Sequence, residues 1–133
     1  MANDAGFQVY RIVGADRTVG VDRTDEVWWR VVSPNGRVMA RSPHEFDDAA
    51  TALEHIGQVR ARRLNLQVSI RVMPSHRWRW QLLLETTVMA VSWADLDRRI
   101  RCEAAWRSFV TLAGTAAVDT RVHTFRRGRV SAS

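Results

Sequence analysis

Four histidines and a single cysteine are the side chains of this 133-residue sequence best suited to metal or nucleophilic chemistry. His44 precedes Glu45, as in the His-Glu-x-x-His signature of zinc proteases, but the fourth residue after His44 is Asp48, so the second histidine ligand is missing. The other histidines, His55, His76 and His123, have no paired ligand spacing either. We therefore expect no metal site.

Nucleophilic and phosphate chemistry also lack their usual arrangements. Cys102 has no histidine within a helical turn to serve as a base, so we expect a buried or half-buried thiol. The adjacent carboxylates Asp47 and Asp48 precede an Ala-rich helical pattern, where helix capping accounts for them. The glycines are isolated and there is no lysine, which excludes a Walker-type loop. We expect no enzyme activity and no cofactor, unless the structure contains a deep pocket with convergent titratable groups.

Tryptophan and arginine are the residue types that favour a binding role. The chain has six tryptophans, and the adjacent Trp28 and Trp29 of one predicted strand must point to opposite faces of a sheet. One of the two needs a partner, or is covered by the N-terminal loop or the C-terminal segment. Such a face suits a protein interface or stacking of nucleobases. The candidate binding residues are Trp28, Trp29, Arg30, Arg77, Arg79, Arg121, Arg126, Arg127 and Arg129.

The net charge of +6 and the pI of about 11.3 arise from one end of the chain. Residues 1–66 hold nine arginines and nine acidic residues, whereas residues 67–133 hold eleven and five. The last thirteen residues contain four arginines and no acidic residue. This basic tail either is disordered and binds polyanions, or joins the sheet as a strand through Val122 and Phe125.

The hydropathy pattern indicates neither a membrane span nor secretion. The longest uncharged stretch rich in apolar residues, 108–118, is far shorter than the roughly 20 residues of a spanning helix. The N-terminus lacks a basic start and an apolar segment, and a lone cysteine cannot form an internal disulfide. We expect a cytoplasmic protein that does not bind membranes.

A repeat organises the elements that must position these side chains. A shift of fifty residues places residues 38–42 on residues 88–92 with four of five identical, and it pairs Trp28 with Trp78 and Asp47 with Asp97. A match that extends through a strand pattern and then a helix pattern indicates duplication of one unit of about fifty residues.

The first unit reads as three strands and a helix. The strands are expected at 7–13, 27–32 and 37–42, the last two joined by a tight turn at Ser33-Pro34-Asn35-Gly36, where Asn-Gly supplies positive φ angles. Asp47 or Asp48 caps a helix that ends near Arg60. Its expected apolar positions are Ala49, Ala52, Leu53, Ile56 and Val59.

The second unit repeats this order with strands at 64–72, 78–84 and 88–93 and a turn at Glu85-Thr86. Asp97 is expected to cap the second helix, and Gly114 to end it. Trp80 and Trp106 are assigned to the core, and Arg77 and Arg79 to the opposite sheet face. The helix residues expected to face the core are Ile100, Ala104, Trp106, Phe109, Val110 and Ala113.

The sequence therefore predicts an α+β fold of two tandem β-β-β-α repeats, forming a pseudo-twofold domain in which both helices cover one face of an antiparallel sheet. The expected boundaries are 1–62 for the first repeat, 63–114 for the second, degenerate repeat, and 115–133 for the basic C-terminal tail, within one compact domain.

The first unit also resembles the YegP-like family of uncharacterised bacterial proteins. The similarity rests on an aromatic strand and Asn-Gly hairpin at 29–42, the run Phe46-Asp47-Asp48-Ala49-Ala50, and the spaced Ile56 and Val59. The resemblance implies tandem copies of a three-strand, one-helix unit and brings no catalytic residues. We expect a non-catalytic module that associates with itself as a homodimer or with a protein partner; the alternative is RNA or DNA binding through the arginines.

Overall fold

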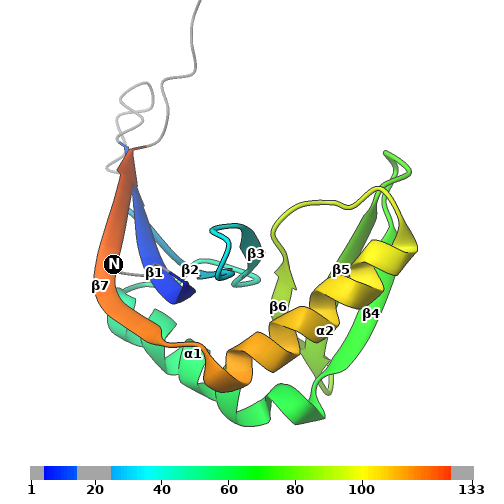
Figure 1. Ribbon diagram of the computed structural model, residues 1–133. Coiled ribbons are helices and arrows are strands. Elements are labelled where there is room, and N and C mark those ends of the chain that lie inside the picture. Colours follow the sequence, from blue (N-terminus) through cyan, green and yellow to red (C-terminus); the bar gives the residue numbers. More distant parts are fainter. Residues whose placement is uncertain (1–4, 15–24, 127–133) are drawn as a thin grey trace, which may run out of the picture.

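The computed structural model describes residues 5–14 and 25–126. It has an α+β fold in which the seven strands of the described residues form one sheet in the order β4-β5-β6-β3-β2-β1-β7 (Figure 1). The elements, in chain order, are β1 (Gly6–Val13), β2 (Glu26–Val32), β3 (Val38–Arg41), α1 (Ala49–Arg62), the short 3-10 helix η1 (Arg63–Asn65), β4 (Gln67–Val72), β5 (Trp78–Leu84), β6 (Thr87–Ser92), α2 (Arg99–Thr115) and β7 (Val118–Arg126).

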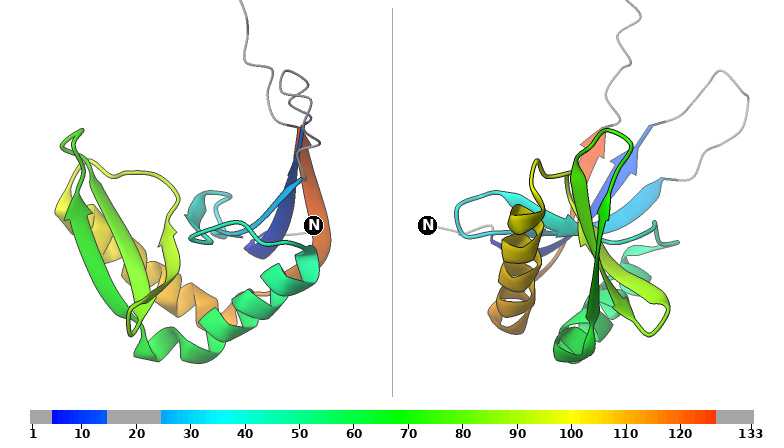
Figure 2. Two further views of the ribbon diagram at one scale, coloured as in Figure 1. Left: turned by 180° about the vertical axis from the view of Figure 1, so that it is seen from behind. Right: turned by 90° about the vertical axis from the view of Figure 1, so that its right-hand side faces the viewer.

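The sheet is antiparallel except for β7, which pairs in parallel with β1. At its centre β3 and β6 share a short antiparallel seam, with Ala40 opposite Ser92 and Arg41 opposite Val91. The sheet bends at this seam, so that its two halves splay apart (Figures 1 and 2). Two structures were predicted for the basic tail, a disordered segment and an added strand. The strand is observed as far as Arg126. Arg127 and Arg129 lie outside the described residues.

Both helices pack on the same face of the sheet. A single cluster of buried residues joins Phe7 and Trp29 of the first half, Trp80 of the second half, Ile56 of α1 and Phe109 of α2. The rings meet edge-on or tilted, with centroids 5.7 Å apart for Phe7 and Trp29 and 5.7 Å for Trp80 and Phe109, as aromatic pairs prefer. The two halves therefore share one core, as their size requires.

The hairpin between β2 and β3 is confirmed, but its turn differs from the predicted one. The Gly36 amide donates to the Ser33 carbonyl at 2.9 Å, and the Ser33 amide donates to the Arg37 carbonyl at 2.8 Å. Gly36 has a φ of 82° whereas Asn35 does not have a positive φ. This geometry fits a type I turn followed by a left-handed glycine, with Pro34 at the position that fixes φ near −65°.

The turn at Glu85 and Thr86 is also confirmed, since Leu84 and Thr87 are paired across it. Glu85 adopts a φ of 56° in place of the glycine usual in such turns.

Helix α1 begins and packs as predicted. Of the two candidates, Asp48 is the capping residue: its Oδ1 accepts hydrogen bonds at 2.7 Å from both the amide and the hydroxyl of Thr51. These bonds lower the pKa of the Asp48 carboxyl. The residues that the helix buries are Ala52, Ile56 and Val59, and it ends at Arg62, two residues beyond the predicted end.

Helix α2 departs from three predictions. Its N-cap is Arg98, which makes no capping side-chain bond; Asp97 instead forms an ion pair with Arg101 at 3.2 Å. Ile100, which is 72% exposed, and the exposed Ala104 do not face the core, because each lies two residues, or about 200°, from the buried Cys102.

Gly114 does not stop α2, which continues to Thr115. Instead it lies where a Cβ atom would be 2.8 Å from the Arg63 guanidinium. The core side of α2 consists of Cys102, Phe109 and Ala113, with Trp106 and Val110 half-buried. Within the described part of the chain, neither helix has the length and apolar character needed to cross a bilayer.

Candidate binding face

The face of the sheet opposite the helices, here called the open face, carries Trp28. Its neighbour Trp29 is 0% exposed and belongs to the core, which settles which of the two tryptophans points away from the helices. Trp28 is half-buried, and its indole Nε1 has no hydrogen-bond partner among the described residues. That nitrogen is itself buried, so what Trp28 contributes to the open face is the apolar surface of its ring.

Four aromatic side chains, here called the aromatic wall, gather on this face: Tyr10, Trp28, Trp93 and Phe125. Tyr10 on β1 is paired with Trp28 on β2, and its ring lies edge-on to Trp93 and Phe125 at centroid distances of 6.4 and 5.8 Å. Trp93 and Phe125 remain 41% and 40% exposed. Burial raises the pKa of the Tyr10 phenol despite the lowering effect of nearby arginines, so the wall is neutral.

Two arginines are stacked on the rings of the aromatic wall. The Arg30 guanidinium lies 5.6 Å from the centroid of Tyr10 and 4.9 Å from that of Phe125, and its Nε donates to Gln8 Oε1 at 3.0 Å. The Arg41 guanidinium lies 5.4 Å from the Trp28 ring. Cation–π contacts hold both guanidinium groups beside the rings of the open face.

Two hollows, of about 290 and 510 Å³, indent the aromatic wall. Both are lined by Tyr10, Ile12, Glu26 and Trp93; the smaller adds Trp28 and Arg41, and the larger adds Arg30, Phe125 and Arg126. The smaller hollow suits one bulky side chain or one planar ring, with a charge of either sign at its rim.

A third hollow of about 260 Å³, here called the arginine hollow, adjoins the wall through Arg41. Arg71 on β4 and Arg79 on β5 stand directly opposite one another and also line it. Arg79 is paired with Asp95 at 2.8 Å. Like charges opposed across strands destabilise a sheet, and one carboxylate cannot offset three guanidinium groups, so this hollow favours an anion.

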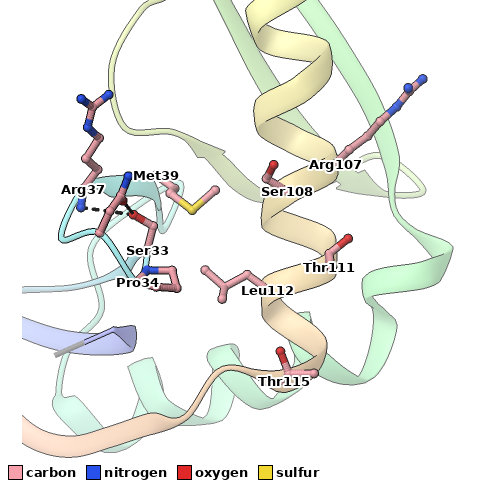
Figure 3. A pocket seen from close by; sticks show the side chains of 10 residues that line it. Ser33, Pro34, Arg37, Met39, Arg107, Ser108, Thr111, Leu112 and Thr115 are labelled. Carbon is pink, nitrogen blue, oxygen red and sulfur yellow. Dashed lines mark hydrogen bonds between the residues drawn. The ribbon is translucent and has the colours of Figure 1, made fainter. Parts of the chain in front are cut away.

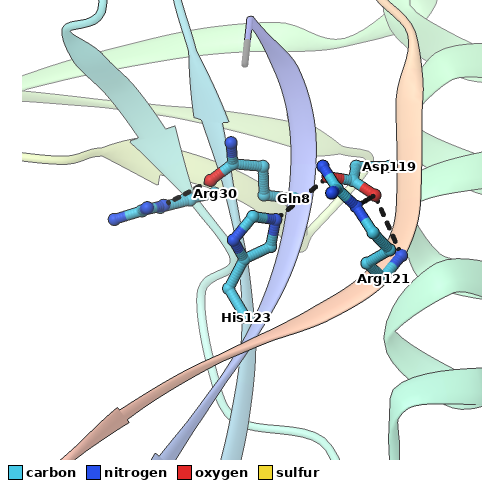
Figure 4. A network of polar contacts seen from close by, with 5 residues as sticks. All are labelled: Gln8, Arg30, Asp119, Arg121 and His123. Atoms are coloured by element: carbon cyan, nitrogen blue, oxygen red, sulfur yellow. Dashed lines mark hydrogen bonds and ion pairs between the residues drawn. The ribbon is translucent and has the colours of Figure 1, made fainter. Parts of the chain in front are cut away.

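Asp119 organises the polar contacts beside β1 (Figure 4). Its carboxylate accepts from the amide, Nε and Nη2 of Arg121 at 2.9, 3.1 and 3.0 Å, and it lies 3.0 Å from Nε2 of His123. These bonds hold the pKa of the Asp119 carboxyl well below its usual range. Arg121 is thus tied to its own strand rather than to the open face.

The structure brings together only part of the predicted binding set. Trp28, Arg30 and Arg126 share the aromatic wall, and Arg79 lies in the arginine hollow. Arg77 donates to the Asp95 carbonyl at 2.9 Å. The site residues that sequence reasoning missed are Tyr10, Arg41, Arg71, Trp93 and Phe125. Strand alternation could have placed Tyr10 on this face, because Tyr10 is an odd number of residues away from Phe7 and Val9, whose side chains point into the core.

A larger cleft of about 830 Å³ lies on the helix side, between the β2–β3 hairpin and α2 (Figure 3). Pro34 and Met39 face Leu112 across it, and hydroxyl groups of α2 complete its lining. Its charged lining residues are Arg37 and Arg107, without a carboxylate or histidine. It therefore does not present the convergent acid and base groups that would point to catalysis. Within the described residues, no group of three or more His, Cys, Asp or Glu could hold a metal ion.

One half-buried histidine, His55, makes folding sensitive to pH. Trp29 Nε1 donates to His55 Nδ1 at 2.9 Å, which requires that nitrogen to be unprotonated. Burial and the nearby His44 lower the pKa of His55 from 6.5 to about 4. The unfolded chain therefore binds one more proton than the folded chain between these two values.

We expect stability to be lost as pH falls from about 6.5 to about 4, by about 3 kcal/mol. Urea unfolding at a series of pH values measures it. His55→Gln keeps a hydrogen-bond acceptor that does not titrate, so it should flatten this part of the profile. His76→Asn, at an exposed turn, should leave the profile unchanged. An unaltered profile for His55→Gln would contradict the assignment.

The fold is that of the YegP-like proteins. No protein-family model and no curated protein matches the sequence. Two solved structures nevertheless match nearly the whole chain. The solution structure of Escherichia coli YegP, a protein of unknown function, has a TM-score of 0.61 at 12% identity, covering 94% of this chain and 97% of that one.

A UPF0339 protein from Shewanella oneidensis gives a TM-score of 0.62 at 11% identity, covering 96% of this chain and 98% of that one. The YegP-like fold expected from residues 29–59 is thereby confirmed, and the similarity extends through the second half of the chain.

Proposed function

We propose that this chain is a non-catalytic interaction module that binds a protein segment through its open face. The observation that carries the proposal is the aromatic wall: four large rings face away from the core, two of them about two-fifths exposed, with arginines stacked on them. Tryptophan, tyrosine and arginine are the residues that dominate the binding energy of protein interfaces.

The charge around the wall specifies the chemistry of the partner segment. The hollow beside Trp28 has room for one bulky apolar side chain, while the adjoining arginine hollow favours a carboxylate. A segment with a large apolar residue close to Asp or Glu satisfies both. Because Arg30 and Arg41 are already held by ring contacts, little side-chain entropy is lost when such a segment binds.

The proposal is tested by selecting peptides from a random library on the wild-type protein and measuring each by fluorescence polarisation. We expect selected peptides to combine acidic and bulky apolar residues and to bind with micromolar affinity. Trp28→Ala combined with Trp93→Ala should weaken binding at least about tenfold, since each truncation removes a centrally placed ring. Arg107→Ala, beside the helix-side cleft, is the matched control and should have no effect.

A library that yields no peptide sensitive to the double variant would overturn the proposal. Nucleic-acid binding is the second candidate, and the opposed Arg71 and Arg79 favour it. It predicts that a single-stranded oligonucleotide binds with strong salt dependence, and that Arg71→Ala reduces the salt slope by about one. Binding of the oligonucleotide in preference to every selected peptide would assign the open face to nucleic acid.

We further propose that the chain is a duplicated unit with pseudo-twofold symmetry. In support, the order β4-β5-β6-β3-β2-β1 reads the same from either half, and the pair Arg41 and Val91 lies at its centre. The bridge from Trp78 to Leu96 corresponds to that from Val27 to Phe46. Trp78 is therefore the counterpart of Val27 rather than of Trp28, because the first hairpin is one residue longer than the second.

A further inference from the structure

The two edges of the sheet differ in what they expose. Strand β7, at one edge, carries charged side chains along its length, including Arg121 and Arg126. Strand β4, at the other edge, has Arg71 as its single charged residue, while Val68 and Val72 are 37% and 56% exposed. An edge strand with exposed branched side chains and little charge is a template for pairing with another strand.

The apolar side of β4 is continuous. Val68, Ile70 and Val72 alternate along the strand, so they point to the helix-covered side of the sheet. Leu64, in η1 just before β4, is 78% exposed. Among the described residues no element lies beyond β4, whereas β7 covers the outer edge of β1.

We propose that β4 pairs antiparallel with β4 of a second copy of this chain, so that the two sheets become one continuous sheet across a twofold axis. The occupant of the edge is thus the chain itself. This inference concerns a different surface from the open face and does not depend on the function proposed for it.

The sequence of β4 is complementary to itself in one register. When Ile70 of each copy stands opposite its equivalent, Val68 of each faces Val72 of the other, and both exposed valines become covered. Ser69 then faces Arg71, so no like charges oppose.

The neighbouring register, centred on Ser69, pairs Val68 with Ile70 but places Val72 opposite Leu66, which lies outside β4, so fewer of its residue pairs lie within the strand. In an antiparallel pair, directly opposed side chains lie on the same face of the sheet. A register midway between these two would oppose side chains that point to different faces, and it is therefore excluded.

The pairing should be weak, because a strand of six residues buries little surface. We expect a monomer–dimer equilibrium with a dissociation constant on the order of micromolar to tens of micromolar. Sedimentation equilibrium of the full chain over a range of concentrations measures it. Val68→Lys and Val72→Glu, each alone, should raise the dissociation constant at least about tenfold. Both replaced positions are exposed, so circular dichroism and thermal unfolding should remain those of the wild type.

The double variant Val68→Lys/Val72→Glu places lysine opposite glutamate twice in the proposed register and should recover dimerisation. Cysteine trapping checks the register directly, in a Cys102→Ala background. Ile70→Cys should form a disulfide-linked dimer, since residues opposed across an antiparallel pair lie within disulfide range. Ser69→Cys should not.

Three outcomes would overturn the inference: a strict monomer at every concentration, crosslinking of Ser69→Cys in preference to Ile70→Cys, or a dimer that is unaffected by Val68→Lys but lost in Trp28→Ala. The last outcome would place self-association on the open face, so a failure of this inference is distinguishable from a failure of the function proposed for that face.

Discussion

Gly6→Ala lowers the free energy of unfolding by at least about 3 kcal/mol. Gly6 has a φ of 120°, a backbone conformation that residues with a side chain rarely adopt. A Cβ atom built there would lie 2.3 Å from the Ala117 carbonyl oxygen. That oxygen belongs to the backbone and cannot rotate aside, so the replacement must displace one of the two strands that meet there.

The effect of Gly6→Ala extends to β7, because the next amide, that of Phe7, donates to the same Ala117 carbonyl at 2.9 Å. This bond joins the start of β1 to the segment that leads into β7. Urea unfolding measures the loss, and amide hydrogen exchange should locate increased opening at residues 118–126. Gly57→Ala is the matched control, since Gly57 lies in α1 with nothing within 4 Å of the added atom.

Gly57→Ala should stabilise the protein by about 0.5–1 kcal/mol, the usual gain from replacing a helical glycine. A Gly6→Ala variant within 1 kcal/mol of wild type would show that the two strands can separate at this point without cost.

Local features of this fold could be read from the sequence because their causes are local. Pro34 and Gly36 define a turn by their own backbone preferences, and Asp48 precedes the helix that it caps. The requirement for Gly6 had no local signal, since the carbonyl that excludes a side chain belongs to Ala117, more than a hundred residues away. The pairing of β7 with β1 was left open for the same reason: it depends on which edge of the sheet is free.

The second half was harder to predict in detail because its sequence follows the pattern less closely. Asp97 stands where Asp47 stands in the first half, but the residue equivalent to the capping Asp48 is Arg98, so the second helix begins without a side-chain cap. Ile100 was predicted to be a core residue from its apolar side chain and its position in the second helix. It lies on the exposed side because the core side is set by Cys102 and Phe109.

The sequence predicts that a binding face with an exposed tryptophan exists, but it does not predict which other residues lie on that face. Adjacent tryptophans require that one face away from the core, and this much follows from strand geometry alone. Tyr10, Trp93 and Phe125 reach that face from β1, from the end of β6 and from β7. Their proximity depends on strand order, which no spacing within a single strand reveals.

Trp29→Ala should destabilise the fold by about 3–5 kcal/mol, the range for removing a fully buried aromatic side chain. The change leaves a cavity beside Phe7, whose ring lies 5.7 Å away, and deprives His55 of the donor at 2.9 Å. Trp28→Ala, one residue earlier in the same strand, should cost about 1 kcal/mol, because Trp28 is half-buried and its Nε1 has no partner among the described residues.

Trp29→Ala should mainly reduce stability and Trp28→Ala should mainly reduce binding, which makes each the control for the other. Chemical denaturation gives the stability of each, and fluorescence polarisation with a peptide selected on the wild type gives its affinity. Trp28→Ala should remain folded and lose affinity. Trp29→Ala, where enough folded protein remains at low temperature, should retain it, because Trp29 lines neither hollow of the aromatic wall. Equal losses of stability would mean that both tryptophans belong to one core and that the open face is covered.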